Sequence, residues 1–87
     1  MRIEHNHSGL YTQGTINDLM REFPVGTVVK LLKMCDNVHP VPAGVKGVVT
    51  DVDAGGVCVD WENHSSLKLL PEIDAYEIIS RPATNEV

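Results

Sequence analysis

Hydrophobic and polar positions along the chain change their spacing near Pro24. On the N-terminal side, apolar residues recur three and four positions apart, as on one face of an amphipathic helix, at Ile16, Leu19, Met20 and Phe23. Thr15 is a suitable N-cap, and Pro24 disfavours the α conformation at the residue before it. The sequence therefore predicts one helix over residues 15–23, with its apolar stripe packed against a core.

Beyond Pro24 the pattern is that of short β-strands separated by turns. We expect strands over five segments, at residues 27–34, 45–53, 57–62, 65–70 and 76–80. The third segment alternates most clearly, with Val57, Val59 and Trp61 on one face and polar residues on the other. This alternation favours Trp61 in the core, whereas an outward-facing Trp61 would be an anchor for a partner.

The length and the strand spacing together predict a single small domain. Five short strands with tight turns favour a mainly β, five-stranded barrel, because closure removes the exposed edges of the sheet. The short N-terminal helix is expected to cover one open end. In a chain of 87 residues, we expect a flexible N-terminal extension over residues 1–13, the barrel over 14–81 and a polar tail over 82–87.

Ordered motifs through the predicted barrel resemble a small family of bacteria and phages, domain of unknown function 4314. They are Pro24-x-Gly26-x-x-Val29-x-Leu31, Met34-x-Asp36, Gly44-x-x-Gly47-x-Val49-x-x-Val52-Asp53, and the run from Trp61 to Leu67. The resemblance covers residues 14–81 and implies an SH3-like barrel. Residues 45–61 are also similar to the KOW element of ribosomal and transcription-factor barrels. The family implies no activity, only a link to phages and other mobile elements.

The sequence departs from the family pattern at a predicted hairpin turn. Where the family has Trp-Asp-Asn-Gly, this chain has Trp61-Glu62-Asn63-His64. A type I′ turn needs a positive φ at both central residues, which Asn63 tolerates and His64 adopts at a cost of about 1 kcal/mol. Replacing His64 by glycine is therefore expected to stabilise the protein.

Composition narrows the class of partner. The net charge is −5 and the few cations are scattered, whereas nucleic-acid-binding domains usually carry a basic patch. An acidic surface instead favours solubility or a basic partner. Aromatic residues make up 5% of the chain, too few for an aromatic groove that captures proline-rich segments. Two cysteines and no long apolar run favour a reduced, cytoplasmic protein with no membrane span.

Candidate catalytic and metal-binding residues do not form a recognisable pattern. The histidines and cysteines lack the spacing of a structural zinc site, so we expect no metal and no cofactor. Cys35 lies near His39 in sequence, but a cysteine nucleophile also needs a lowered thiol pKa. Asp51, Asp53 and Asp60 are expected on neighbouring strands or their turn, where paired acids could act in acid–base catalysis or bind a divalent cation. In an acidic protein we expect them to be ordinary surface acids. We therefore predict a protein that is not an enzyme.

These observations favour a non-enzymatic protein-interaction module linked to mobile elements. The predicted contact surface combines a long loop with the turn after residue 62, and comprises Met34, Asp36, His39, Pro40, Val41, Asn63 and His64. A KOW-like nucleic-acid accessory module is one alternative, which needs one shared face for Lys30, Lys33, Lys46 and Lys68. An acidic, phage-type inhibitor of a nucleic-acid-processing enzyme is another, which needs a stripe of Asp51, Asp53, Asp60, Glu62 and Glu72. The partner and the oligomeric state stay open.

Overall fold

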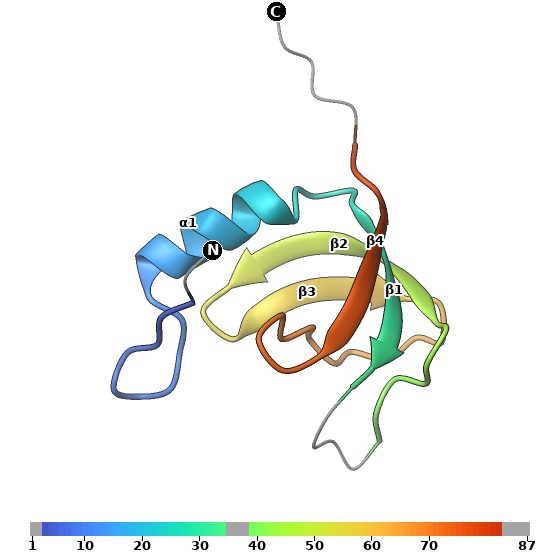
Figure 1. Ribbon diagram of the computed structural model, residues 1–87, viewed down its shortest axis with the longest axis horizontal. Coiled ribbons are helices and arrows are strands. Elements are labelled where there is room, and N and C mark those ends of the chain that lie inside the picture. The colour runs from blue at the N-terminus through green and yellow to red at the C-terminus, as the bar shows by residue number, and fades with distance from the viewer. Residues whose placement is uncertain (1–2, 35–38, 83–87) are drawn as a thin grey trace, which may run out of the picture.

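One antiparallel sheet and one short helix make up the computed structural model, which describes residues 3–34 and 39–82. The elements are α1 (Gln13–Glu22), β1 (Val28–Lys33), β2 (Lys46–Asp53), β3 (Gly56–Trp61) and β4 (Ala75–Ser80). The four strands lie in the order β3-β2-β1-β4, with every neighbouring pair antiparallel (Figure 1). The prediction of a mainly β domain with one short helix is confirmed.

Helix α1 begins two residues earlier than predicted, because Thr12 rather than Thr15 is its N-cap. The Thr12 hydroxyl accepts a hydrogen bond from the Thr15 amide at 3.3 Å, which satisfies a free donor of the first turn. Thr15 is buried, and its own hydroxyl accepts from the Glu4 amide at 2.8 Å. The Thr15 hydroxyl, predicted to cap the helix, therefore binds the backbone of the N-terminal segment instead.

The apolar stripe of α1 packs on the sheet beside β2, at one end of the fold (Figure 1). Ile16, Leu19 and Phe23 are buried, as predicted. Met20 is 44% exposed, so the stripe is narrower than its sequence spacing indicated. The helix ends at Glu22 and Phe23 follows in a non-helical conformation, which agrees with the restriction that Pro24 places on it.

The core lies between α1 and the inner face of the sheet, which carries Val29 and Leu31 of β1 and Val57 and Val59 of β3. Trp61 is 1% exposed, so the inward orientation predicted from the alternation in β3 is confirmed. Its indole nitrogen donates to the Leu67 carbonyl oxygen at 2.8 Å, which leaves the buried donor satisfied.

Residues 65–70 do not form the predicted strand, so the described chain has four strands and not five. Their pairing with β3 is limited to one bridge, between Val57 and Leu69. Nearby side chains occupy the backbone donors instead, since Asn63 accepts from the Ser65 amide and Ser65 accepts from the Leu67 amide. Such local bonds compete with a strand ladder. The sheet has β3 and β4 at its two edges and is not closed by a fifth strand.

The turn after β3 is not the predicted type I′ turn. The His64 amide donates to the Trp61 carbonyl oxygen at 2.9 Å, which places Glu62 and Asn63 at the two central positions. Among the described residues other than glycine, His64 alone has a positive φ, of 64°. Since Asn63 does not share it, the prediction of the turn type is wrong, but the left-handed backbone at His64 is present.

The N-terminal segment lies against the body of the fold. Tyr11 is buried, its amide donates to the Ala54 carbonyl oxygen at 2.9 Å, and its hydroxyl donates to Glu72 at 2.6 Å. The boundary set at residue 14 falls inside α1. At the other end of the described chain, Arg81 forms an ion pair with Glu22 at 2.8 Å.

Candidate surface site on the outer face of the sheet

The face of the sheet that points away from the core, called the outer face here, carries two rows of side chains that run across the strands. In the first row, Val28 of β1 pairs with Val48 of β2, which pairs with Asp60 of β3. In the second, Lys30 pairs with Lys46 on one side and with Glu77 of β4 on the other. Residues paired in this way point to the same side of a sheet and lie close together.

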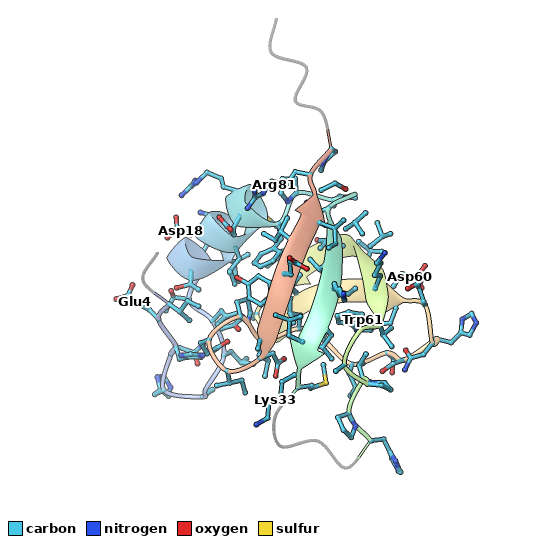
Figure 2. All side chains as sticks on the ribbon, turned by 45° about the vertical axis from the view of Figure 1, so that its right-hand side comes forward. Glu4, Asp18, Lys33, Asp60, Trp61 and Arg81 are labelled. Carbon is cyan, nitrogen blue, oxygen red and sulfur yellow. The ribbon has the colours of Figure 1, made fainter. Side chains whose placement is uncertain are left out.

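A groove of about 360 Å³ lies on the β1–β2–β3 part of the outer face. This volume is at the lower end of the range for small-molecule sites. Its lining combines the apolar surface of two valines with charged and imidazole side chains from β2, β3 and the following turn, and comprises Val28, Lys46, Gly47, Val48, Asp60, Trp61, Glu62 and His64. Figure 2 shows Asp60 on the outside of the sheet.

Gly47 lines the groove from β2 and lies directly against β3. A Cβ atom at this position would lie 2.9 Å from both the Asp60 carbonyl oxygen and Cε3 of Trp61, and closer still to Cγ1 of Val59. Backbone oxygen and a buried indole cannot move away easily in a close-packed interior. Glycine at position 47 therefore permits the close contact of β2 with Val59, Asp60 and Trp61 of β3.

One acid at each end of the second row limits the repulsion between its two lysines. Lys30 and Lys46 are directly opposite each other, and like charges in this position are destabilising. Glu77 flanks Lys30. Glu62 flanks Lys46, whose amide donates to the Glu62 carboxylate at 3.0 Å. The two lysines therefore lie between two acids and do not form an isolated basic patch.

Asp60 is the acid of the groove with the most available carboxylate. Asp60 is exposed. Its carboxylate makes no hydrogen bond or ion pair with any part of the chain that the structure describes. The neighbouring Glu62 already accepts one backbone bond, but its side chain is exposed as well. Val48 of β2, which pairs with Asp60, is 42% exposed. The groove thus combines solvent-accessible apolar surface with an accessible negative charge.

The residues predicted as a contact surface are not all at the surface. Met34 is 8% exposed and Val41 is 2% exposed, so both belong to the core and are not available to a partner. His39, Pro40 and Asn63 are exposed but do not line the groove. His64 is exposed and does line it. Asp36 lies outside the described residues.

Neither charged cluster required by the two alternative functions is fully assembled. Of the four lysines, Lys30 and Lys46 are neighbours, whereas Lys68 holds Asp53 at 2.7 Å. Lys33 lies at the end of β1, away from the groove (Figure 2). Of the five acids, Asp60 and Glu62 share the groove, Asp53 is engaged by Lys68, and Glu72 accepts from Tyr11.

The strongly perturbed titratable groups lie away from the groove. Lys68 lowers the pKa of Asp53 by hydrogen bonding to its carboxylate. Burial and the charge of Asp53 raise the pKa of the Cys58 thiol, the opposite of what a cysteine nucleophile needs. Burial and the hydrogen bond to Glu72 raise the pKa of Tyr11. Cys35, the other candidate thiol, lies outside the described residues.

The described residues contain neither a cluster of metal-binding side chains nor a helix that could span a membrane. Within residues 3–34 and 39–82, no three histidine, cysteine or acidic side chains are grouped closely enough to hold a metal ion. In the same part of the chain, α1 is the helix present, and it is neither long nor apolar enough to cross a membrane. The groove on the outer face is therefore the best-defined candidate site.

The family model for domain of unknown function 4314 (DUF4314) matches residues 12–79. The chain belongs to this family. The match covers α1 and all the strands except the last residue of β4, and so it includes every residue that lines the groove. It confirms the family resemblance found in the sequence motifs. No similar curated protein and no similar solved structure was found.

Proposed function

We propose that this DUF4314 domain is a non-enzymatic protein-interaction module that binds a segment of a partner protein in the groove of the outer face. The observation that carries the proposal is the row Val28–Val48–Asp60, which places accessible apolar side chains directly beside an available carboxylate. Interfaces typically combine an apolar centre with a polar rim. Leu32 of β1 and Ile79 of β4 are exposed as well, but neither lines the groove.

Charge supports a protein partner over a nucleic acid. Binding to nucleic acid depends on several lysines and arginines that neutralise phosphates. Here the adjacent pair Lys30 and Lys46 is flanked by Glu77 and Glu62, and the whole chain has a net charge of −5. A phosphate backbone laid across the outer face would meet two acids for each pair of lysines.

The titratable groups support binding rather than catalysis. A general acid or base is expected in a pocket, with its pKa tuned by its surroundings. In the described residues, the clearly shifted groups are Tyr11, Asp53, Cys58, Lys68 and Tyr76, and none of them lines the groove. As part of the same proposal we retain the SH3-like relation, a cytoplasmic location and a link to mobile elements.

A peptide-display selection tests the proposal directly. A random peptide library is selected on immobilised wild-type protein, and the enriched peptides are then measured against two variants, Val48→Lys and Met20→Lys. The two residues are 42% and 44% exposed, so the changes are matched in exposure, but Met20 lies on α1, away from the groove. We expect Val48→Lys to weaken the selected peptides by about ten-fold or more, and Met20→Lys to leave them unchanged.

Two results would contradict the proposal. One is the absence of any enriched peptide whose binding depends on Val48. The other is equal loss in both variants, which would indicate a general effect of added positive charge. Thermal unfolding of each variant, followed by circular dichroism, confirms that it is folded before binding is compared.

A further inference from the structure

We propose that the groove recognises an arginine side chain of the partner, laid across the strands from β1 toward β3. This inference rests on the proposed function and specifies what the partner presents. The geometry comes from the row Val28–Val48–Asp60, in which two apolar side chains are followed by an acid. Adjacent strands are about 4.8 Å apart, so the row extends over about 10 Å.

The chemistry of the row matches the two parts of an arginine side chain. Long basic side chains place their methylene stems on apolar surface and keep the charged end in water. A stem on Val28 and Val48 directs the guanidinium to the Asp60 carboxylate, which is exposed and free of other bonds within the described chain. Charge-assisted hydrogen bonds of this kind are the stronger ones in proteins.

Two further side chains favour arginine over lysine. Glu62 follows the last residue of β3, lines the same groove and presents a second, exposed carboxylate. His64 lines the same groove with an exposed ring. A guanidinium stacks on aromatic rings and forks between acceptors, whereas the ammonium group of lysine acts as a point charge.

Lys46 sets the direction in which the arginine lies. Among the described residues it is the lysine that lines the groove, and it lies between Lys30 of β1 and Glu62. Its charge repels a guanidinium on the β2 side, so the favourable position is over β3, near Asp60. Removal of Lys46 is therefore expected to strengthen binding, which is the opposite of the effect expected from removal of Asp60.

The arginine is expected to come from a partner and not from a second copy of this chain. Both arginines in the described residues are already paired with acids, Arg21 with Asp18 and Arg81 with Glu22. A second copy also carries the same net charge of −5, which opposes association.

The test is a titration of ¹⁵N-labelled full-length protein with Ac-Val-Arg-Val-NH₂, followed by NMR. Two control peptides replace the arginine with citrulline, its neutral near-isostere, or with lysine. We expect shifts at the Val48 and His64 amides, a Kd near the millimolar range for so short a peptide, and binding weaker by about ten-fold with citrulline. Lysine is expected to fall between the two.

Three variants with matched changes complete the experiment. Asp60→Asn is expected to weaken the arginine peptide by about three- to ten-fold, and Lys46→Gln to strengthen it by about two-fold. Asp51→Asn makes the same change in net charge on the β2–β3 hairpin, at an exposed residue outside the groove, and is expected to have little effect.

Three outcomes overturn the inference: equal binding of the arginine and citrulline peptides, equal effects of Asp60→Asn and Asp51→Asn, or no shift in the groove with the arginine peptide. If display-selected peptides still depend on Val48 in any of these cases, the arginine specificity is wrong and the interaction module stands. If no peptide depends on Val48, both are wrong.

Discussion

Gly47 offers the sharpest test of how β2 and β3 pack, through the substitution Gly47→Ala. The added Cβ would lie 2.9 Å from the Asp60 carbonyl oxygen and from Cε3 of Trp61, where normal carbon contacts need about 3.5 Å or more. Neither neighbour can retreat, because one is backbone in β3 and the other is the largest buried side chain. Forcing one extra carbon into a packed core costs about 1–3 kcal/mol. We expect the cost of Gly47→Ala to lie at the upper end of this range.

The expected loss of about 3 kcal/mol is large for this protein. A chain of 87 residues has a free energy of unfolding on the order of 4–13 kcal/mol. For a domain of this size, the loss corresponds to a decrease in Tm of roughly 12–24 °C. Thermal and urea unfolding, followed by circular dichroism, measure both quantities.

Gly14→Ala is the matched control, because the same methyl group is added where nothing lies within 4 Å except the adjacent residues and the backbone of α1. Gly14 is in α1, and alanine is the better helix former, so this variant is expected to be more stable by up to about 1 kcal/mol. The two substitutions should thus have opposite signs. If the free energy of unfolding of Gly47→Ala lies within about 0.5 kcal/mol of the wild-type value, β2 does not pack against Trp61 as closely as described.

Three further predictions concern groups outside or at the rim of the groove. Tyr11→Phe removes the hydrogen bond to Glu72 and is expected to cost about 1–2 kcal/mol in urea unfolding. The pKa of Tyr11 is raised in the folded state above its ordinary value of 10, so this contribution is present below pH 10 and is lost as the pH rises further. Above pH 10, the free energy of unfolding of the wild type should therefore fall more steeply than that of Tyr11→Phe. Parallel pH profiles of the two proteins would contradict a raised pKa of Tyr11. Lys68→Met is expected to raise the pKa of Asp53, measured by NMR titration of its carboxylate, and an unchanged value would exclude the ion pair. His64→Gly is expected to stabilise the protein by about 1 kcal/mol in thermal unfolding because φ is 64°, and a loss of stability would reveal a contact of the imidazole.

The strands with one buried face were the part of the fold that sequence reasoning predicted best. In β3, alternation placed Val57, Val59 and Trp61 in the core, and all three are there. The pattern is informative because one face of this antiparallel sheet packs on the core and the other meets water. The helix was also recognised from its spacing, since Leu19 and Phe23 are buried as the period required.

Errors arose where side chains compete for backbone hydrogen bonds. The segment 65–70 has the composition of a strand, but Asn63 and Ser65 occupy amides that a strand ladder would use. The start of α1 was misplaced for a similar reason, because Thr12 and Thr15 are equally suitable caps. The contact from the Glu4 amide to the Thr15 hydroxyl joins residues that are far apart in sequence, and no local pattern reveals it.

The candidate site was only partly predictable. His64 was selected because it departs from the family pattern, and it does line the groove. Val41 was selected as part of a long loop, and Met34 as a large apolar side chain beside it, but both side chains are buried in the core. The groove itself depends on the register that brings Val28, Val48 and Asp60 into one row, and the register of three strands cannot be read from any one of them.

The central claim is that a natural protein partner binds at the groove, and a comparative pull-down tests it most directly. Wild-type protein, Val48→Lys and Met20→Lys are used as bait in a lysate of the source cells, with and without nuclease, and bound proteins are quantified by mass spectrometry. We predict a discrete partner that nuclease treatment does not remove, that Met20→Lys retains and that Val48→Lys loses. Partners that disappear with nuclease, or that Val48→Lys binds as well as the wild type, would contradict it.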